Sequence, residues 1–234
     1  MKLKNPRPIF LETLFIIGWL ACATGPLFAA NRQSELAQKI INEPAFPYRL
    51  VWAGDQTPSE NESQALWDAL QIMRETGVRA GITRLELFVA ANPHSPWTPA
   101  LQSNLAQFYR RHGRYSLALP HWEGAWEATK EFKDGQGKAV ADMTLAYWTP
   151  LLASLGQLET LSRLLDETKG RALDNGAFEA RFNATREAVA GMIQKPGISY
   201  GCGTYAVYNV LRTFDRQNSD LAKIAKIPFF IASI

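Results

Sequence analysis

The sequence predicts an all-α protein, and three observations support this fold class. Apolar residues recur every three or four positions from Ser63 onward. The gaps between these periodic segments are short, and each contains a glycine or proline of the kind that ends helices. Sustained alternation of apolar and polar residues, which would indicate a strand, does not occur before about residue 198. We therefore expect helices throughout 63–190.

The composition is that of a folded protein. The chain has 234 residues, a net charge of +3, 47% apolar residues and 20% charged residues. This length allows one or two domains with a buried core, and the composition excludes disordered and fibrous proteins. The balanced charge gives no reason to expect a nucleic acid as a partner.

The N-terminus has the order of a secretory signal peptide. A positive start is followed by an apolar run at 14–23 and a stretch of small residues up to Ala30. We expect residues 1–30 to be removed and the protein to be exported, to the periplasm or outside the cell. Residues 31–62 would then form an N-terminal extension. Two alternatives stay open: the run remains as an uncleaved membrane anchor, or Cys22 carries a lipid, although Trp19 stands where a lipobox has Leu.

Each predicted helix has its own apolar stripe and its own breaker. We expect four of the seven tryptophans in the core rather than on a sugar-binding surface; they are Trp97, Trp122, Trp126 and Trp148. The stripes and the residues that end them are 66–73 with Gly77, 82–89 with Asn92-Pro93, 101–109 with Gly113, 115–126, 138–155 with Gly156, and 158–168.

The turn glycines indicate repeats. Gly77, Gly113 and Gly156 each lie in the turn of a predicted helical hairpin, at spacings of 36 and 43 residues. Such periods are typical of stacked helix pairs, and they predict an α-solenoid over 63–192. A generic helical bundle is the alternative.

The middle hairpin resembles a tetratricopeptide repeat. Ala106 and Ala118 are expected where the two helices approach most closely, while Gln107 is expected to be exposed. The resemblance implies a concave surface that binds a protein or peptide. The matching small and aromatic positions are Leu105, Ala106, Tyr109, Gly113, Tyr115, Ala118 and Ala125.

The remaining polar residues give weak signals. The three histidines, His94, His112 and His121, lie in different segments without the spacing of a helical metal pair. We expect neither a metal nor a cofactor. The cluster of Arg110, Arg111 and Arg114 suits the last turn of a helix, where the helix dipole favours positive charge; an anion site is the alternative.

The C-terminal part changes character after Lys195-Pro196-Gly197. Cys202 lies between two glycines, just before an apolar helix expected at 205–214 that we expect to be buried. A helix N-terminus favours the thiolate, so Cys202 is a candidate nucleophile. The alternative is a small apolar side chain beside a tight turn.

The stretch Tyr200–Val207 resembles the papain-like domain of cysteine peptidases that process double-glycine leaders. Cys202, Gly203 and Ala206 match that motif, and Val207 stands where Leu is usual. The resemblance also implies a Gln six residues before the cysteine, but Pro196 stands there, which leaves Gln194 as a weak oxyanion candidate.

We expect the segment 193–234 to be an incomplete, inactive peptidase domain. A papain-like site needs a downstream histidine, and no histidine follows His121 before Ile234. The leading functional hypothesis is therefore an exported helical-repeat module that binds a protein or peptide. The alternative is a cysteine peptidase with Cys202 as nucleophile and the rest of its site supplied elsewhere. A third hypothesis, that the protein binds a glycan, is suggested by the tryptophans alone.

The first prediction concerns the Cys202 thiol. Titration with iodoacetamide against pH, with Cys202→Ser as the blank, should give an apparent pKa below the usual value of about 8.5. The chain alone should not hydrolyse a double-glycine leader peptide, because no base follows the cysteine. A pKa at or above the usual value would leave only the packing interpretation, and turnover abolished by Cys202→Ser would contradict the predicted inactivity.

Overall fold

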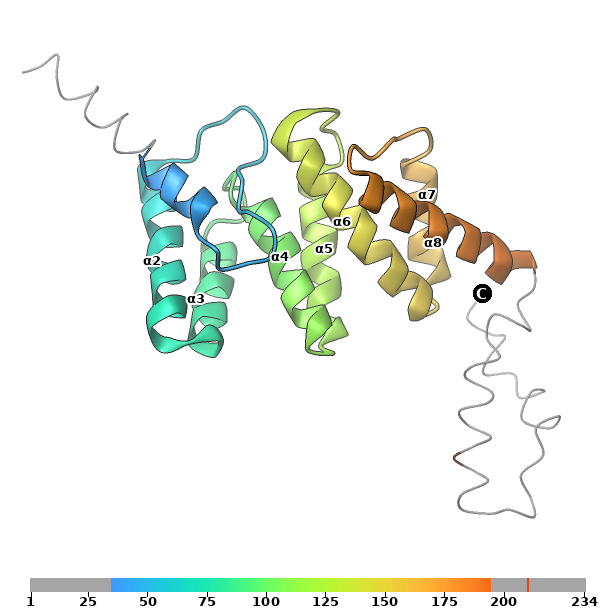
Figure 1. Ribbon diagram of the computed structural model, residues 1–234, viewed down its shortest axis with the longest axis horizontal. Coiled ribbons are helices and arrows are strands. Elements are labelled where there is room, and N and C mark those ends of the chain that lie inside the picture. The colour runs from blue at the N-terminus through green and yellow to red at the C-terminus, as the bar shows by residue number, and fades with distance from the viewer. Residues whose placement is uncertain (1–34, 195–209, 211–234) are drawn as a thin grey trace, which may run out of the picture. The chain divides into compact units, whose positions relative to one another are not determined.

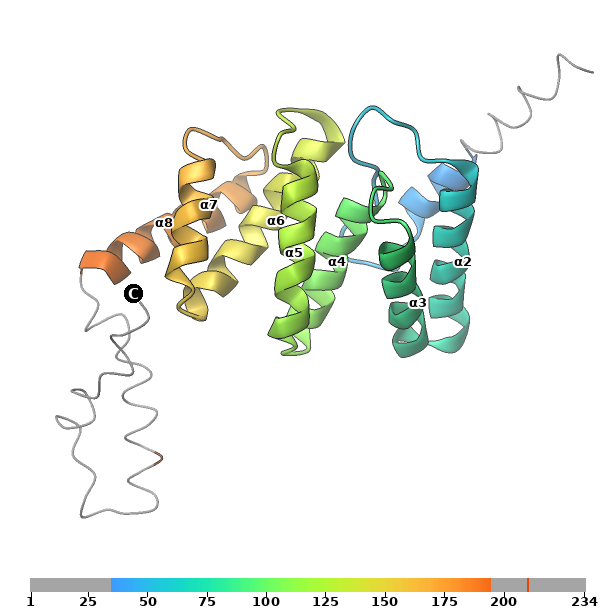
Figure 2. The ribbon, with the colours of Figure 1, turned by 180° about the vertical axis from the view of Figure 1, so that it is seen from behind.

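The computed structural model describes residues 35–194 and Val210, and every regular element within 35–194 is helical (Figures 1 and 2). The all-α prediction is confirmed for this part of the chain. A short helical segment at 35–42 precedes the labelled helices. These are α2 (Glu60–Thr76), α3 (Val78–Ala91), α4 (Thr98–Arg111), α5 (Tyr115–Thr129), α6 (Gly135–Ser154), α7 (Leu158–Glu167) and α8 (Gly176–Gln194).

The chain divides into two compact units between Leu105 and Ala106, inside helix α4. In the first unit, α2 begins with a capping box. The Ser59 hydroxyl accepts a hydrogen bond from the backbone N–H of Glu62, whose carboxylate accepts one from the backbone N–H of Ser59. Burial alone would raise the pKa of Glu62, but the hydrogen bonds from Ser59 outweigh it and lower the pKa. The helix therefore begins before Ser63, where the apolar stripe starts.

Helices α2 and α3 pack as a hairpin that turns at Gly77, where φ is +97°. The two helices approach each other closely at Gly81. A Cβ atom on Gly81 would clash with the Cβ and Cα atoms of Met73. The absence of a side chain at Gly81 therefore sets the spacing of this hairpin.

Trp97 is at the centre of the first unit's core. Its side chain is fully buried, its indole N–H donates a hydrogen bond of 3.1 Å to the Ser63 hydroxyl, and its ring meets Trp52 edge to face at 5.4 Å. A buried indole N–H needs an acceptor, and Ser63 provides it from the apolar face of α2.

In the second unit, α6 contacts α5, α7 and α8 and lies between α5 and α8 in both views (Figures 1 and 2). Its middle is buried on almost every side, from Val140 to Ala146. Trp122, Trp126 and Trp148 are at most 2% exposed, so the predicted core positions of these side chains are confirmed.

The glycines predicted to end helices are found in turns between helices. Gly113 and Gly156 lie between helices with φ of +69° and +68°, a conformation that favours glycine. The described helices include none long and apolar enough to span a bilayer.

The prediction that Gln107 is exposed is wrong. Its side chain is 2% exposed, and its amide nitrogen has no hydrogen-bond partner. Helix α4 is buried around most of its circumference at this point. The burial of the neighbouring polar residues Ser103 and Asn104 shows this. Ala106 and Ala118 are both fully buried, as a close helix approach requires.

The second prediction tests the close contact in the α2–α3 hairpin. Gly81→Ala should lower the free energy of unfolding by about 1–3 kcal/mol, because the added Cβ meets the Met73 backbone. The matched control is Gly191→Ala in α8, where an added Cβ meets nothing within 4 Å. The control should be neutral or stabilising by up to about 1 kcal/mol. Urea unfolding of both variants measures this, and equal shifts would contradict the predicted close contact.

Candidate functional site

A groove of about 330 Å³ lies where residues of α4, α6 and α8 come together. We call it the α6–α8 groove, because these two helices supply all but one of its lining residues. It is lined by Arg110 from α4, by Ala146, Tyr147, Pro150 and Ala153 from α6, and by Arg181, Ala184, Thr185 and Ala188 from α8.

Small side chains at helical spacing leave this groove open. On α6 they recur as Ala146, Pro150 and Ala153, and on α8 as Ala184 and Ala188. Residues at these intervals of three and four positions share one face of a helix. Since the facing side chains are short, they do not fill the space between the two helices, although the helices themselves are in contact.

Tyr147 is the largest side chain in the groove, and α8 fixes it from two sides. Phe178 meets the Tyr147 ring edge to face with 5.9 Å between ring centroids. The Arg181 guanidinium lies over the same ring, with its carbon 4.6 Å from the centroid, which is a cation–π distance. The ring and the guanidinium therefore form one ordered unit at the groove wall.

The charged groups in the groove lining are two guanidinium groups, Arg110 and Arg181. No carboxylate lines the groove, and neither arginine takes part in the ion pairs found among the described residues. The groove is thus apolar along its walls and positively charged.

Pro150 adds a backbone feature. It lies inside α6 and has no N–H, so the Ala146 carbonyl one turn earlier does not receive the hydrogen bond that a helix normally supplies. Both residues line the groove.

A second hollow, of about 490 Å³, lies beside the ends of α5 and α7, and three of its charged lining residues are already paired within the protein. Lys130 pairs with Glu127 at 2.6 Å, and Arg171 pairs with Asp142 at 3.0 Å. Glu167 accepts a hydrogen bond of 3.0 Å from the Trp126 indole and pairs with Arg163. The hydrogen bonds outweigh the effect of burial and lower the pKa of Glu167.

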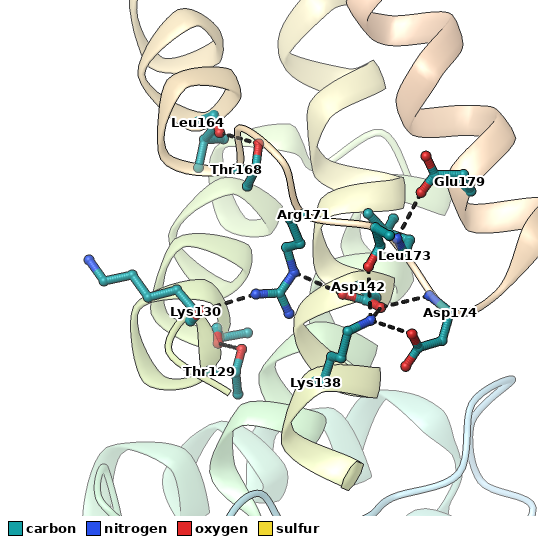
Figure 3. A network of polar contacts seen from close by, with 12 residues as sticks. Thr129, Lys130, Lys138, Asp142, Leu164, Thr168, Arg171, Leu173, Asp174 and Glu179 are labelled. Atoms are coloured by element: carbon teal, nitrogen blue, oxygen red, sulfur yellow. Dashed lines mark hydrogen bonds and ion pairs between the residues drawn. The ribbon is translucent and has the colours of Figure 1, made fainter. Parts of the chain in front are cut away.

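Arg171 belongs to a buried ionic network that joins the α7–α8 loop to α6 (Figure 3). Asp142, only 2% exposed, accepts hydrogen bonds from Lys138 at 2.6 Å, from Arg171 at 3.0 Å and from the backbone N–H of Asp174 at 3.1 Å. Arg171 also donates to the Lys130 carbonyl at 3.0 Å, at the end of α5. The network therefore connects three parts of the second unit.

Lys138 lies between two carboxylates. Its ammonium group contacts Asp142 and Asp174, each at 2.6 Å, and donates to the Ala172 carbonyl. Burial alone would lower the pKa of Lys138, but the hydrogen bonds to the two carboxylates outweigh it and raise the pKa. The lysine's contribution to stability is therefore present at neutral pH and is lost only as the pH rises through the raised folded-state pKa.

The residues singled out from the sequence are not brought together in the described part of the chain. Cys202 lies outside the described residues. Gln194 is the last residue of α8, is exposed and does not line the groove. His112 lies against Phe108, and His121 stacks on Tyr109, so both rings make packing contacts.

Sequence reasoning missed Tyr147, Arg181 and Asp142. For Asp142 a signal existed: Lys138 and Asp142 stand four residues apart in a helix that has no other charged residue, and this spacing indicates an ion pair. Arg110 was noted for its position at a helix end, but its place in the groove depends on α8, which lies far along the sequence.

Comparison with protein-family models, with curated proteins and with solved structures finds no match to this chain.

The third prediction concerns the buried network. Asp142→Asn should lower the free energy of unfolding by about 3–5 kcal/mol, because Lys138 and Arg171 lose their buried counter-charge. The control is Asp174→Asn, whose side chain is 72% exposed, and an exposed ion pair is worth less than about 1 kcal/mol. Urea unfolding at pH 7 measures both variants. Similar losses in the two would mean that Asp142 does not hold the network together.

Proposed function

We propose that this chain is a protein-interaction module that binds an extended or helical peptide segment in the α6–α8 groove. The observation that carries the proposal is the groove itself. It is an apolar depression with walls of small side chains and an ordered tyrosine, and the described residues provide no side chain that fills it. Clefts with this mixture of apolar walls and a few fixed polar groups are typical binding sites.

The proposal includes stacked tetratricopeptide-like hairpins, as the sequence predicts. Glycines with positive φ at 77, 113 and 156 support it, because they stand in the helix–helix turns at the spacing of the repeats. The complete burial of Ala106 and Ala118 supports it as well. Stacked hairpins leave one continuous face for a ligand, and in such a stack α4, α6 and α8 would be the first helices of successive pairs. These are the helices that line the groove.

Export is part of the same proposal, and its support is the signal-like order of residues 1–30. The cysteine-peptidase alternative stays a prediction of the sequence, because its nucleophile candidate Cys202 lies outside the described residues.

The fourth prediction tests the groove as a binding site. Random 12-residue peptides displayed on phage are selected against the immobilised full chain, and the enriched sequences are then measured as synthetic peptides. Ala184→Trp should weaken their binding at least about tenfold, or about 1.4 kcal/mol, because the indole fills the groove.

The matched control is Ala190→Trp on the same helix. Ala190 is exposed and does not line the groove, so this variant should bind as the wild type does. Peptides that tolerate Ala184→Trp, or that lose affinity equally in both variants, would contradict the proposal. Circular dichroism of both variants checks that the helices remain.

A further inference from the structure

We propose that the α6–α8 groove selects acidic peptide segments, in which an Asp or Glu side chain lies next to small or aliphatic residues. This inference rests on the proposed function and goes beyond it by naming the chemistry of the partner. It depends on charge complementarity between the groove and its occupant.

The first argument is the imbalance of charge. Arg110 and Arg181 line the groove, and no carboxylate does. Three other cations of the second unit that are buried or half-buried have their own counter-charges. Arg171 and Lys138 pair with Asp142, and Lys130 pairs with Glu127. The groove arginines can therefore still pair with a carboxylate, whereas these three cations are already paired.

The second argument is the position of Arg181. A cation in the last turn of a helix, such as Arg110 in α4, is favoured by the helix dipole whether or not it binds anything. Arg181 lies in the second turn of α8, so it gains nothing from the dipole at the end of that helix. The dipole that favours Arg110 therefore does not account for an arginine at this place.

The third argument is the geometry of the guanidinium. Arg181 lies over the face of the Tyr147 ring, with 4.6 Å between its carbon and the ring centroid. Among the described residues no hydrogen bond from the Arg181 guanidinium is found, so its N–H groups are available to donate, and a carboxylate accepts two of them in parallel. The tyrosine also limits the movement of the arginine, so little side-chain freedom remains to be lost on binding.

The apolar walls strengthen this preference. Ala153, Ala184 and Ala188 contribute only methyl groups, so an occupant that covers them removes water from around the two arginines. A charge pair that forms away from water is stronger than one on an open surface. Small or aliphatic residues beside the acidic one would cover these methyl groups without a clash.

The test uses the full chain and three fluorescein-labelled 12-residue peptides measured by fluorescence anisotropy. All three contain the same alanine, leucine and serine residues and differ at two central positions, which are both Glu, both Gln or both Lys. The Glu peptide should bind about tenfold more tightly than the Gln peptide, and the Lys peptide should bind most weakly. This preference should shrink at 0.5 M salt.

The variants Arg110→Gln and Arg181→Gln should each reduce the Glu-to-Gln preference toward one. Arg111→Gln is the matched control, because it removes the same charge from the adjacent position on α4, is exposed and does not line the groove. Arg181→Lys keeps the charge but not the planar pair of donors, and it should restore only part of the preference.

The outcomes separate the two proposals. Equal binding of the Glu and Gln peptides, both weakened by Ala184→Trp, would overturn the acidic preference and leave the groove as a binding site. Failure of every peptide to bind would overturn both. The alternative outcome is that a ten-residue oligothymidylate displaces the Glu peptide and loses its own binding in Arg181→Gln. That result would show that the groove accepts phosphate groups, and it would overturn the inference.

Discussion

The placement of α8 depends on one buried carboxylate. Asp142 holds Arg171, Lys138 and the backbone N–H of Asp174 in one network, and two of these three residues belong to the loop that precedes α8. At the start of the helix, Glu179 accepts a hydrogen bond from the backbone N–H of Leu173 in the same loop. The path of α8 along α6, and with it one wall of the groove, follows from where this loop is held.

The sequence predicted the helices well because each prediction averages many weak signals. The stripe 66–73 and its breaker Gly77 agree with α2, and the tryptophans on such stripes are buried. The start of α2 was placed too late, although Ser59 and Glu62 have the spacing of a capping box that can be read from the sequence. An apolar pattern marks the face of a helix but not its first turn, which is polar.

Features that depend on distant neighbours were not predictable in the same way. Gln107 looks like a surface residue by type, and only the packing around α4 buries it. Tyr147 and Arg181 are 34 positions apart in the sequence, and nothing local indicates that the guanidinium covers the ring. Several of the groove-lining residues are alanines, which a sequence pattern assigns to helix interiors rather than to a site.

The alanine walls have a consequence for how this protein can change over time. Ala184 and Ala188 are exposed and contribute little to the core, whereas Phe182 and Val189 on the same helix are buried. Mutations at the exposed positions can therefore reshape the groove at little cost to folding, while the buried positions and the Asp142 network keep α8 in place. Related chains that keep this scaffold would be free to diverge in the ligands they recognise.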